Sequence, residues 1–264
     1  MGRTPPRLRW AAASALAVIA ADAWACGFSA PQFEAGVEHQ HWAEFEDGRR
    51  IVREQGSLPR IGAGVVVRCA AVELDLAASA THGSRRYDGL TNLGRRVTTT
   101  TDWREHELAL AAWPWQLPLG LRLSGREAQR KLRSTGSARG YLEQHRAAEL
   151  AVGLRHAAAL PPAGWRWELQ AWLGGHAGGR LHVDLPQAEP ATLRTGRAVQ
   201  LEARLRIARM AAGRSGPHAE LRMLWRDTAA GPASPLWQDG RLVGSAMQPR
   251  TTQSSLGLAI GHRW

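Results

Sequence analysis

The side chains that could perform catalysis are few and scattered along the sequence. His182 and Asp184 are separated by one residue, so the carboxylate could orient the imidazole for proton transfer. No closely spaced pair of aspartates in the second predicted loop accompanies them, and no cluster of residues has the spacing of a metal site. Four further histidines could act as the general base of a serine hydrolase, but their spacing in the sequence singles out none of them: His106, His145, His156 and His262. We therefore predict no catalytic residue, no metal and no cofactor.

Cys26 and Cys69 are the only two cysteines. In an exported protein they could form a disulfide, because the periplasm permits oxidation. Two separately used thiols are the alternative. Lipid attachment at Cys26 is a third interpretation, although Ala23 stands where a lipoprotein signal usually carries a leucine-type residue.

Charged side chains of both signs recur on one face of many segments that alternate between polar and apolar residues. A desolvated charge must be paired, and the planar fork of arginine can bridge two carboxylates. The interior of a small barrel is just wide enough for side chains, so we favour a salt-bridged interior over an ion-selective pore. The predicted lumen charge network comprises Glu73, Asp75, Glu105, Glu107, Arg122, Glu149, Arg155, Arg166, Glu168, Glu202, Arg204, Arg206, Glu220 and Arg222.

Period-two alternation is the pattern that must position these charges, and it is typical of β-strands with one apolar face. No stretch after the N-terminal segment is apolar enough for a membrane helix. We predict an all-β fold, a closed antiparallel transmembrane β-barrel of ten strands, with eight or twelve as alternatives. The expected strands are 33–45, 61–67, 72–79, 105–113, 117–124, 148–155, 165–171, 199–207, 219–226 and 255–264.

Both ends of the chain carry export signals. Arg3, Arg7 and Arg9 precede the short apolar run 11–21, and small residues follow at the positions that a signal peptidase accepts. We expect residues 1–25 to be a cleaved signal peptide and residues 26–264 to form the barrel. The last strand alternates apolar and small or polar residues and ends on the aromatic Trp264. It resembles the C-terminal recognition strand of outer-membrane barrels, and the chain as a whole resembles small Gram-negative barrels of the OmpA/OmpX type. The resemblance implies the outer membrane as location and the barrel-assembly machinery as a partner during insertion.

The expected connections differ in length between the two sides. Short Pro- or Gly-rich turns are expected near 69, 114–116, 161–164 and 213–217, and long polar loops at 46–59, 81–102, 127–140, 174–197 and 227–250. Short periplasmic turns and long extracellular loops are typical of outer-membrane barrels. Tryptophan is favoured at the membrane–water interface, so the periplasmic strand ends predict an aromatic girdle of Trp113, Trp115, Trp165, Trp167 and Trp264.

Basic residues dominate the expected loops, and the chain has a formal net charge of +11. The predicted loop basic patch is Arg85, Arg86, Arg95, Arg96, Arg130, Lys131 and Arg133. Such a surface would be attracted to the phosphates of lipopolysaccharide, or to polyanionic glycans outside the cell. We expect a monomer that binds no nucleic acid.

Ten-stranded barrels include the omptin proteases, which place an aspartate pair opposite an Asp-His pair at the extracellular rim. This chain resembles them in strand count, but only His182 and Asp184 offer half of such a site. We therefore predict a non-enzymatic outer-membrane barrel with a structural or surface-interaction role. A narrow small-solute channel and an extracellular-rim hydrolase are the alternatives.

Overall fold

The protein is described by a computed structural model that covers residues 26–29, 31–90, 94–115, 117–136, 139–161, 164–186, 188–209 and 216–264. The predicted signal peptide, residues 1–25, lies outside the described residues. Among the described residues, no helix is long and apolar enough to cross a membrane.

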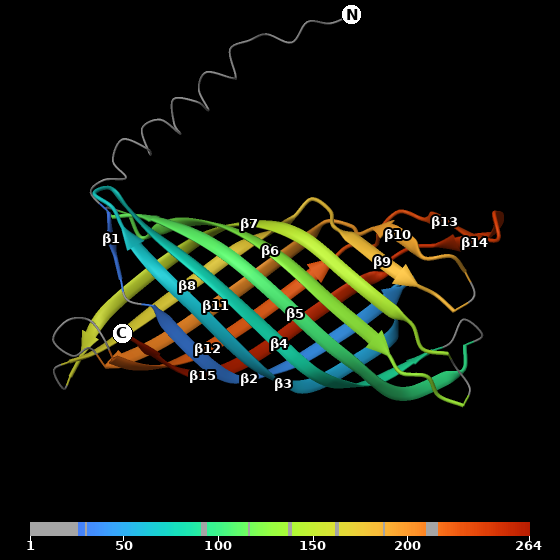
Figure 1. Cartoon of the computed structure of the whole chain (residues 1–264), viewed down its shortest axis with the longest axis horizontal. Helices are drawn as coiled ribbons and strands as arrows, with labels where there is room; N and C mark the ends of the chain where they lie inside the picture. The colour runs from blue at the N-terminus through green and yellow to red at the C-terminus, as the bar shows by residue number, and fades with distance from the viewer. Residues whose placement is uncertain are drawn as a thin grey trace, which may run out of the picture.

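Ten long antiparallel strands form one sheet that closes on itself (Figure 1). Each strand pairs with the next along the ring, and the β7–β8 pairing completes the circle. The prediction of a closed, antiparallel, ten-stranded barrel is confirmed. The wall strands are β2 (Gln32–Glu46), β3 (Arg49–Arg68), β4 (Val72–Leu90), β5 (Arg96–Pro114), β6 (Leu119–Leu132), β7 (Leu142–Leu160), β8 (Trp165–His176), β11 (Ala198–Arg209), β12 (Gly216–Thr228) and β15 (Arg250–Arg263).

Five shorter strands complete the described structure, and three of them belong to the same sheet as the wall. β1 (Gly27–Phe28) pairs with the end of β3, at the same end of the barrel as the C-terminus. At the other end, β9 (Arg180–Asp184) pairs with the first residues of β7, Leu142–Arg146, and so continues the wall. β10 (Ala191–Arg194) pairs with β9. A separate hairpin of β13 (Ser234–Gln238) and β14 (Arg241–Ala246) projects beyond them (Figure 1).

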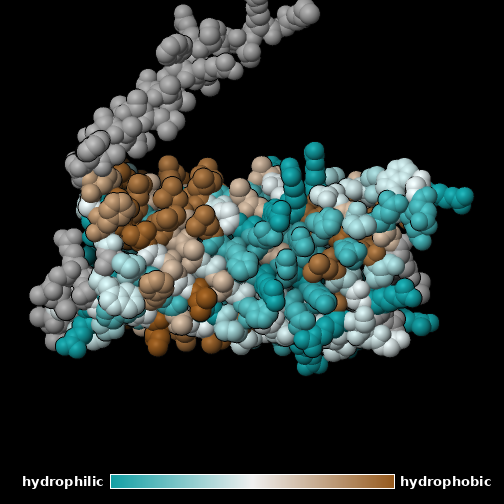
Figure 2. All heavy atoms as spheres, in the orientation of Figure 1, coloured by the Kyte–Doolittle hydropathy of each residue, from teal (hydrophilic) through white to brown (hydrophobic). Residues whose placement is uncertain are grey.

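The alternation of the sequence separates an outer from an inner face. Leu121, Leu150 and Leu258 are examples of the outward-facing side chains, and all three are exposed. The inward-facing residues between them are polar and buried, as Arg122 and Glu149 are. Figure 2 shows the outward apolar side chains gathered over the half of the visible face that lies towards the C-terminus, whereas the other half is hydrophilic. The apolar half is the band that a bilayer would surround.

The wall strands continue far beyond this band at the end away from the C-terminus, the predicted extracellular end (Figure 1, Figure 2). The expected loops at 46–59 and 81–102 are therefore mostly wrong, because β3 covers Arg49–Arg68, β4 reaches Leu90 and β5 begins at Arg96. The expected loop at 127–140 is shorter than predicted, because β6 ends at Leu132. The outer face of these extensions meets water, so polar residues occupy both faces and the apolar alternation disappears. The extensions are joined by short turns, such as Asp47–Gly48 between β2 and β3, where both residues have the positive φ that a two-residue hairpin requires.

Candidate functional site

The middle of the barrel interior is organised around Glu202 of β11. Its carboxylate accepts hydrogen bonds from Arg122 of β6 at 2.7 Å and from Arg222 of β12 at 3.0 Å. Arg204, two residues along β11, donates a third at 2.5 Å. Arg222 also pairs with Glu107 of β5 at 3.1 Å. This middle cluster therefore connects opposite walls of the barrel through charge-assisted hydrogen bonds.

A second cluster fills the extracellular half of the interior. The guanidinium of Arg130 contacts the carboxylates of Glu44 at 2.9 Å, Glu54 at 2.7 Å and Glu143 at 2.8 Å. Arg85 pairs with Glu54 at 2.9 Å, and its guanidinium lies 3.7 Å from the centroid of an aromatic ring of Trp103. All of these side chains are buried.

This upper cluster corrects the predicted loop basic patch. Arg85 and Arg130 lie inside the barrel, because the strands that carry them extend past the apolar band and their positions share the inward face. The other five members lie on the outside or in the turns and are exposed, namely Arg86, Arg95, Arg96, Lys131 and Arg133. Arg96 pairs with Asp88 at 2.6 Å and Arg133 with Asp102 at 2.7 Å. The outward charge of the extensions is therefore partly neutralised.

Further ion pairs fill the interior below and between these clusters. Glu73 contacts Arg155 and, at 2.8 Å, Arg68. Arg206 pairs with Glu220 at 2.8 Å. Two more pairs are Arg126–Glu105 at 3.0 Å and Arg226–Glu149 at 2.6 Å. Of the other members of the predicted network, Asp75 and Glu168 line a small inner cavity. Arg166 is exposed at the periplasmic rim.

The predicted network missed Glu44, Glu54 and Arg226, which are central to the clusters. Each occupies an inward position of a wall strand. Glu44 and Arg226 lie within the expected strands 33–45 and 219–226, where alternate positions share one face. Glu54 falls in the expected loop 46–59 and would have been found only if that strand had been extended.

Two indole rings are packed inside the periplasmic half. Trp113 and Trp172 are fully buried, with ring centroids 4.6 Å apart. Gly120 and Gly153 make room for them, because a Cβ atom at either glycine would collide with the neighbouring indole. Trp113 is therefore an interior residue and not a girdle residue, because it occupies one of the alternate positions of β5 whose side chains point into the barrel.

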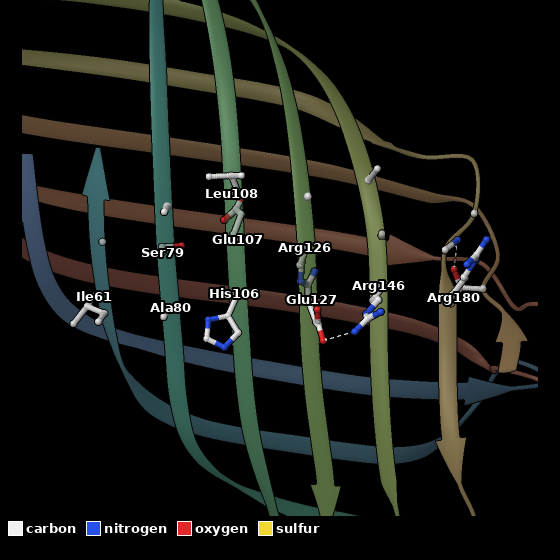
Figure 3. A pocket seen from close by; sticks show the side chains of 18 of the residues that line it. Ile61, Ser79, Ala80, His106, Glu107, Leu108, Arg126, Glu127, Arg146 and Arg180 are labelled. Carbon is white, nitrogen blue, oxygen red and sulfur yellow. Dashed lines mark hydrogen bonds and ion pairs between the residues drawn. The ribbon is translucent and has the colours of Figure 1, made fainter. Parts of the chain in front are cut away.

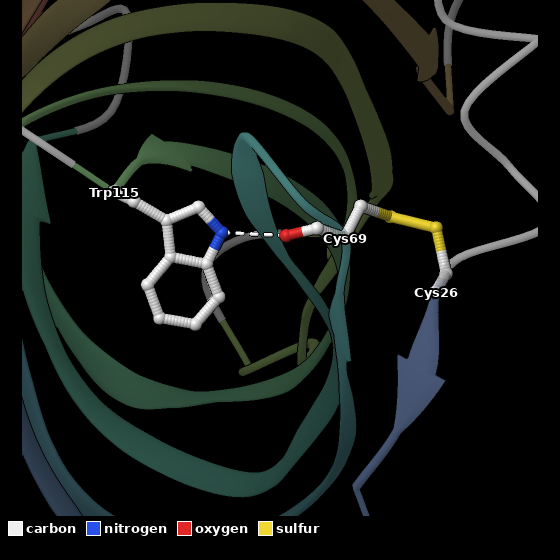
Figure 4. The surroundings of a disulfide bond; sticks show 3 residues. All are labelled: Cys26, Cys69 and Trp115. Carbon is white, nitrogen blue, oxygen red and sulfur yellow. Dashed lines mark hydrogen bonds between the residues drawn. A yellow bond between two sulfur atoms is a disulfide. The ribbon is translucent and has the colours of Figure 1, made fainter.

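The other four predicted girdle residues lie near the same end of the barrel: Trp115, Trp165 and Trp264 are exposed, and Trp167 is partly exposed. Figure 4 shows the Trp115 indole Nε1 donating a hydrogen bond to the backbone oxygen of Cys69, at 2.6 Å. A disulfide joins Cys69 to Cys26 and so fastens the chain before β2 to the turn after β3 (Figure 4).

The free space in the interior is small. One cavity, beside Asp75, Glu107 and Glu220, has a volume of about 40 Å³, and another, beside Glu149 and Arg226, has about 50 Å³. Each has room for a few water molecules.

The outer wall carries a row of basic side chains directly above the apolar band. His106, Glu127, Arg146, Arg180 and Arg194 lie opposite one another on successive strands from β5 to β10. Figure 3 shows the first four crossing the wall in one row. Arg146 pairs with Glu127 at 3.0 Å, whereas Arg180 and Arg194 are exposed and follow it without an intervening carboxylate.

A second pair of basic side chains extends this row. His82 of β4 lies opposite Arg104 of β5, and both are exposed. We call the six basic residues His82, Arg104, His106, Arg146, Arg180 and Arg194 the cationic belt. Below it, Ala78, Gly125, Ala148 and Gly178 line a broad hollow of about 1480 Å³ on the outer wall, where side chains are small. The belt thus lies above a recess in the apolar surface.

The histidines that could serve catalysis are not brought together. The His182 ring contacts the Thr192 hydroxyl at 3.2 Å, and no contact with Asp184 exists in the described part of the chain. His145 lies beside Glu143, His156 packs near Trp167, and His262 packs near Trp264. Within the described ranges, no group of three or more His, Cys, Asp and Glu side chains could hold a metal ion.

Known structures with a similar fold are outer-membrane barrels. Outer membrane protease OmpT from Escherichia coli is 11% identical, over 90% of this chain and 98% of that one, with a TM-score of 0.49. The β domain of the Bordetella autotransporter BrkA is 13% identical, over 89% and 100%, with a TM-score of 0.47. Neisserial surface protein A is 10% identical, over 90% and 99%, with a TM-score of 0.39. No protein-family model and no curated protein matches the sequence. These likenesses concern the fold and say nothing of activity.

Proposed function

We propose that the protein is a non-conducting, non-enzymatic barrel of the outer membrane that acts through its outer surface. In this proposal the cationic belt holds the phosphate groups of lipopolysaccharide, and the recess below it accommodates acyl chains. The charged interior stabilises the barrel and closes it.

The observation that carries the proposal is the row Arg146, Arg180 and Arg194. Directly opposite residues on neighbouring strands have Cβ atoms about 4.5–5.5 Å apart, and like charges at this distance destabilise a sheet. Three guanidinium groups in succession, with a carboxylate only beside the first, therefore favour a bound polyanion. Arginine binds phosphate oxygens through two parallel hydrogen bonds.

The position of the row supports a lipid as the source of that anion. The row lies at the upper border of the apolar band, where the headgroups of the outer leaflet would meet the wall. The hollow below it is lined by alanine and glycine at positions where neighbouring wall segments carry leucine, such as Leu123 and Leu150. The surface thus combines a charged border with apolar space for a chain.

The test compares lipid A with dephosphorylated lipid A for binding to the refolded barrel in detergent, measured by microscale thermophoresis. The double variant Arg180→Gln/Arg194→Gln is expected to weaken binding of phosphorylated lipid A at least tenfold. The matched control is Arg209→Gln, an exposed arginine at the periplasmic end of β11, which should leave binding unchanged. Equal binding of both lipids, or equal losses in both variants, would contradict the proposal.

A further inference from the structure

A half-enclosed pocket opens at the extracellular mouth of the barrel, on the inner side of the wall and away from the belt. Its volume is about 260 Å³, close to the lower limit for pockets that hold small organic molecules. Leu181 and Val183 of β9 and Leu193 of β10 form a buried apolar wall. Met247 lines the open rim and is itself exposed.

The floor of this mouth pocket is polar. Glu44 of β2 and Glu143 of β7 line it, together with His145 and the ring of Trp42. The Trp42 indole Nε1 donates to Glu44 at 3.3 Å. The pocket therefore has an apolar wall above and two carboxylates below.

The charges of this floor do not balance. Glu44, Glu54 and Glu143 face only two guanidinium groups, those of Arg85 and Arg130. The three carboxylates therefore exceed the two guanidinium groups by one charge. Such an imbalance next to a cavity favours a cationic group within it.

Tyr141 also lines the pocket and does not alter this balance. It lies in the turn before β7, where burial and then the charge of Glu143 raise the pKa of its hydroxyl well above the ordinary value. The hydroxyl therefore stays neutral and protonated.

Gln248 provides an independent indication of a ligand. It lines both the mouth pocket and the inner cavity beside Glu149 and Arg226, only 4% of its surface is exposed, and its side-chain oxygen accepts no hydrogen bond from any described residue. Buried polar atoms in native proteins are almost always paired. An N–H donor inside the pocket would satisfy this oxygen.

We propose that the mouth pocket binds a small amphipathic monocation, with a primary ammonium group at Glu44 and Gln248 and an apolar body against Leu181, Val183 and Leu193. The carboxylates disfavour anions, and a neutral apolar molecule would leave the excess negative charge uncompensated. Occupancy of this pocket is independent of the belt, which lies on the opposite face of the wall.

The probe is 2-phenylethylamine, compared with the neutral 2-phenylethanol and the anionic 3-phenylpropanoate. Isothermal titration calorimetry with the refolded mature barrel in detergent is expected to show saturable binding of the amine and at least tenfold weaker binding of the other two. Glu44→Gln should weaken amine binding at least tenfold. Its matched control, Glu127→Gln on the outer wall, should not.

Glu44 also contacts Arg130, so heat-dependent gel mobility must confirm that the Glu44→Gln barrel is folded. Met247→Trp gives a second test that leaves the charges intact: a bulky ring at the rim should narrow the pocket and weaken the amine at least tenfold. Absence of amine binding at millimolar concentration, equal binding of the alcohol, or unchanged affinity in Met247→Trp would overturn the proposal.

Discussion

The replacement Glu202→Gln tests whether the middle cluster stabilises the barrel. Glu202 is fully buried and contacts three guanidinium groups, those of Arg122, Arg204 and Arg222. The variant keeps the size of the side chain but removes the carboxylate that all three arginines contact, while Arg222 keeps its ion pair with Glu107. Breaking a buried ion pair by removing one partner costs about 3–5 kcal/mol. We expect the free energy of unfolding to fall by about that amount.

The assay is urea unfolding of the refolded barrel in detergent, followed by tryptophan fluorescence and extrapolated linearly to zero denaturant. Glu127→Gln is the control, because its ion pair with Arg146 is exposed and such pairs contribute about 0–1 kcal/mol. Adding Arg122→Met to Glu202→Gln should recover part of the loss, since Arg122 pairs with Glu202 and loses that counter-charge in the single variant. A loss below about 1 kcal/mol for Glu202→Gln, or no recovery in the double variant, would refute the reasoning.

Three further results are expected. Replacing Cys26 and Cys69 by serine removes a cross-link over 43 residues and should lower the free energy of unfolding by up to about 4 kcal/mol, from the loop-entropy relation, measured by the same urea assay; an unchanged midpoint would contradict this. Trp113→Ala should lower the free energy of unfolding by about 3–5 kcal/mol, because the ring is buried against Trp172. Trp115→Ala should lower it clearly less, because that ring is exposed; a larger loss for Trp115→Ala than for Trp113→Ala would contradict the interior position of Trp113. Binding of lipid A should weaken steadily between 50 mM and 500 mM salt, because exposed charges are screened, and a salt-independent affinity would argue against the belt.

The strands could be predicted wherever their outer face is apolar. There the contrast between lipid-facing residues, such as Leu121 and Leu123, and interior ones, such as Arg122, makes the period of two visible. Above the membrane the outer face is polar as well, so the alternation carries no hydropathy signal. That is why Arg85 and Arg130 were assigned to loops although they are among the most buried residues.

Whether a residue faces the interior is better predicted from its odd or even position along the strand than from its distance to a turn. Trp113 was assigned to the girdle because it precedes a periplasmic turn, yet it shares the inward face of β5 with Ala109 and Ala111. Trp115 lies beyond the end of that strand, and its ring is exposed.

The partners of the interior charges were beyond sequence reasoning. Arg122 and Glu202 are 80 residues apart, and they meet only because the barrel is narrow enough for side chains from opposite walls to touch. Which charges meet depends on the closure and stagger of the ring. A sequence pattern gives the inward face but neither of these quantities.

The central claim is that side chains close the interior, and single-channel recording in planar bilayers tests it most directly. We expect the refolded barrel to insert without any steady unitary conductance in 1 M KCl, while a 16-stranded porin recorded under the same conditions conducts. The inner cavities of about 40 and 50 Å³ predict this result. Stable, reproducible unitary steps from the wild-type barrel would contradict it.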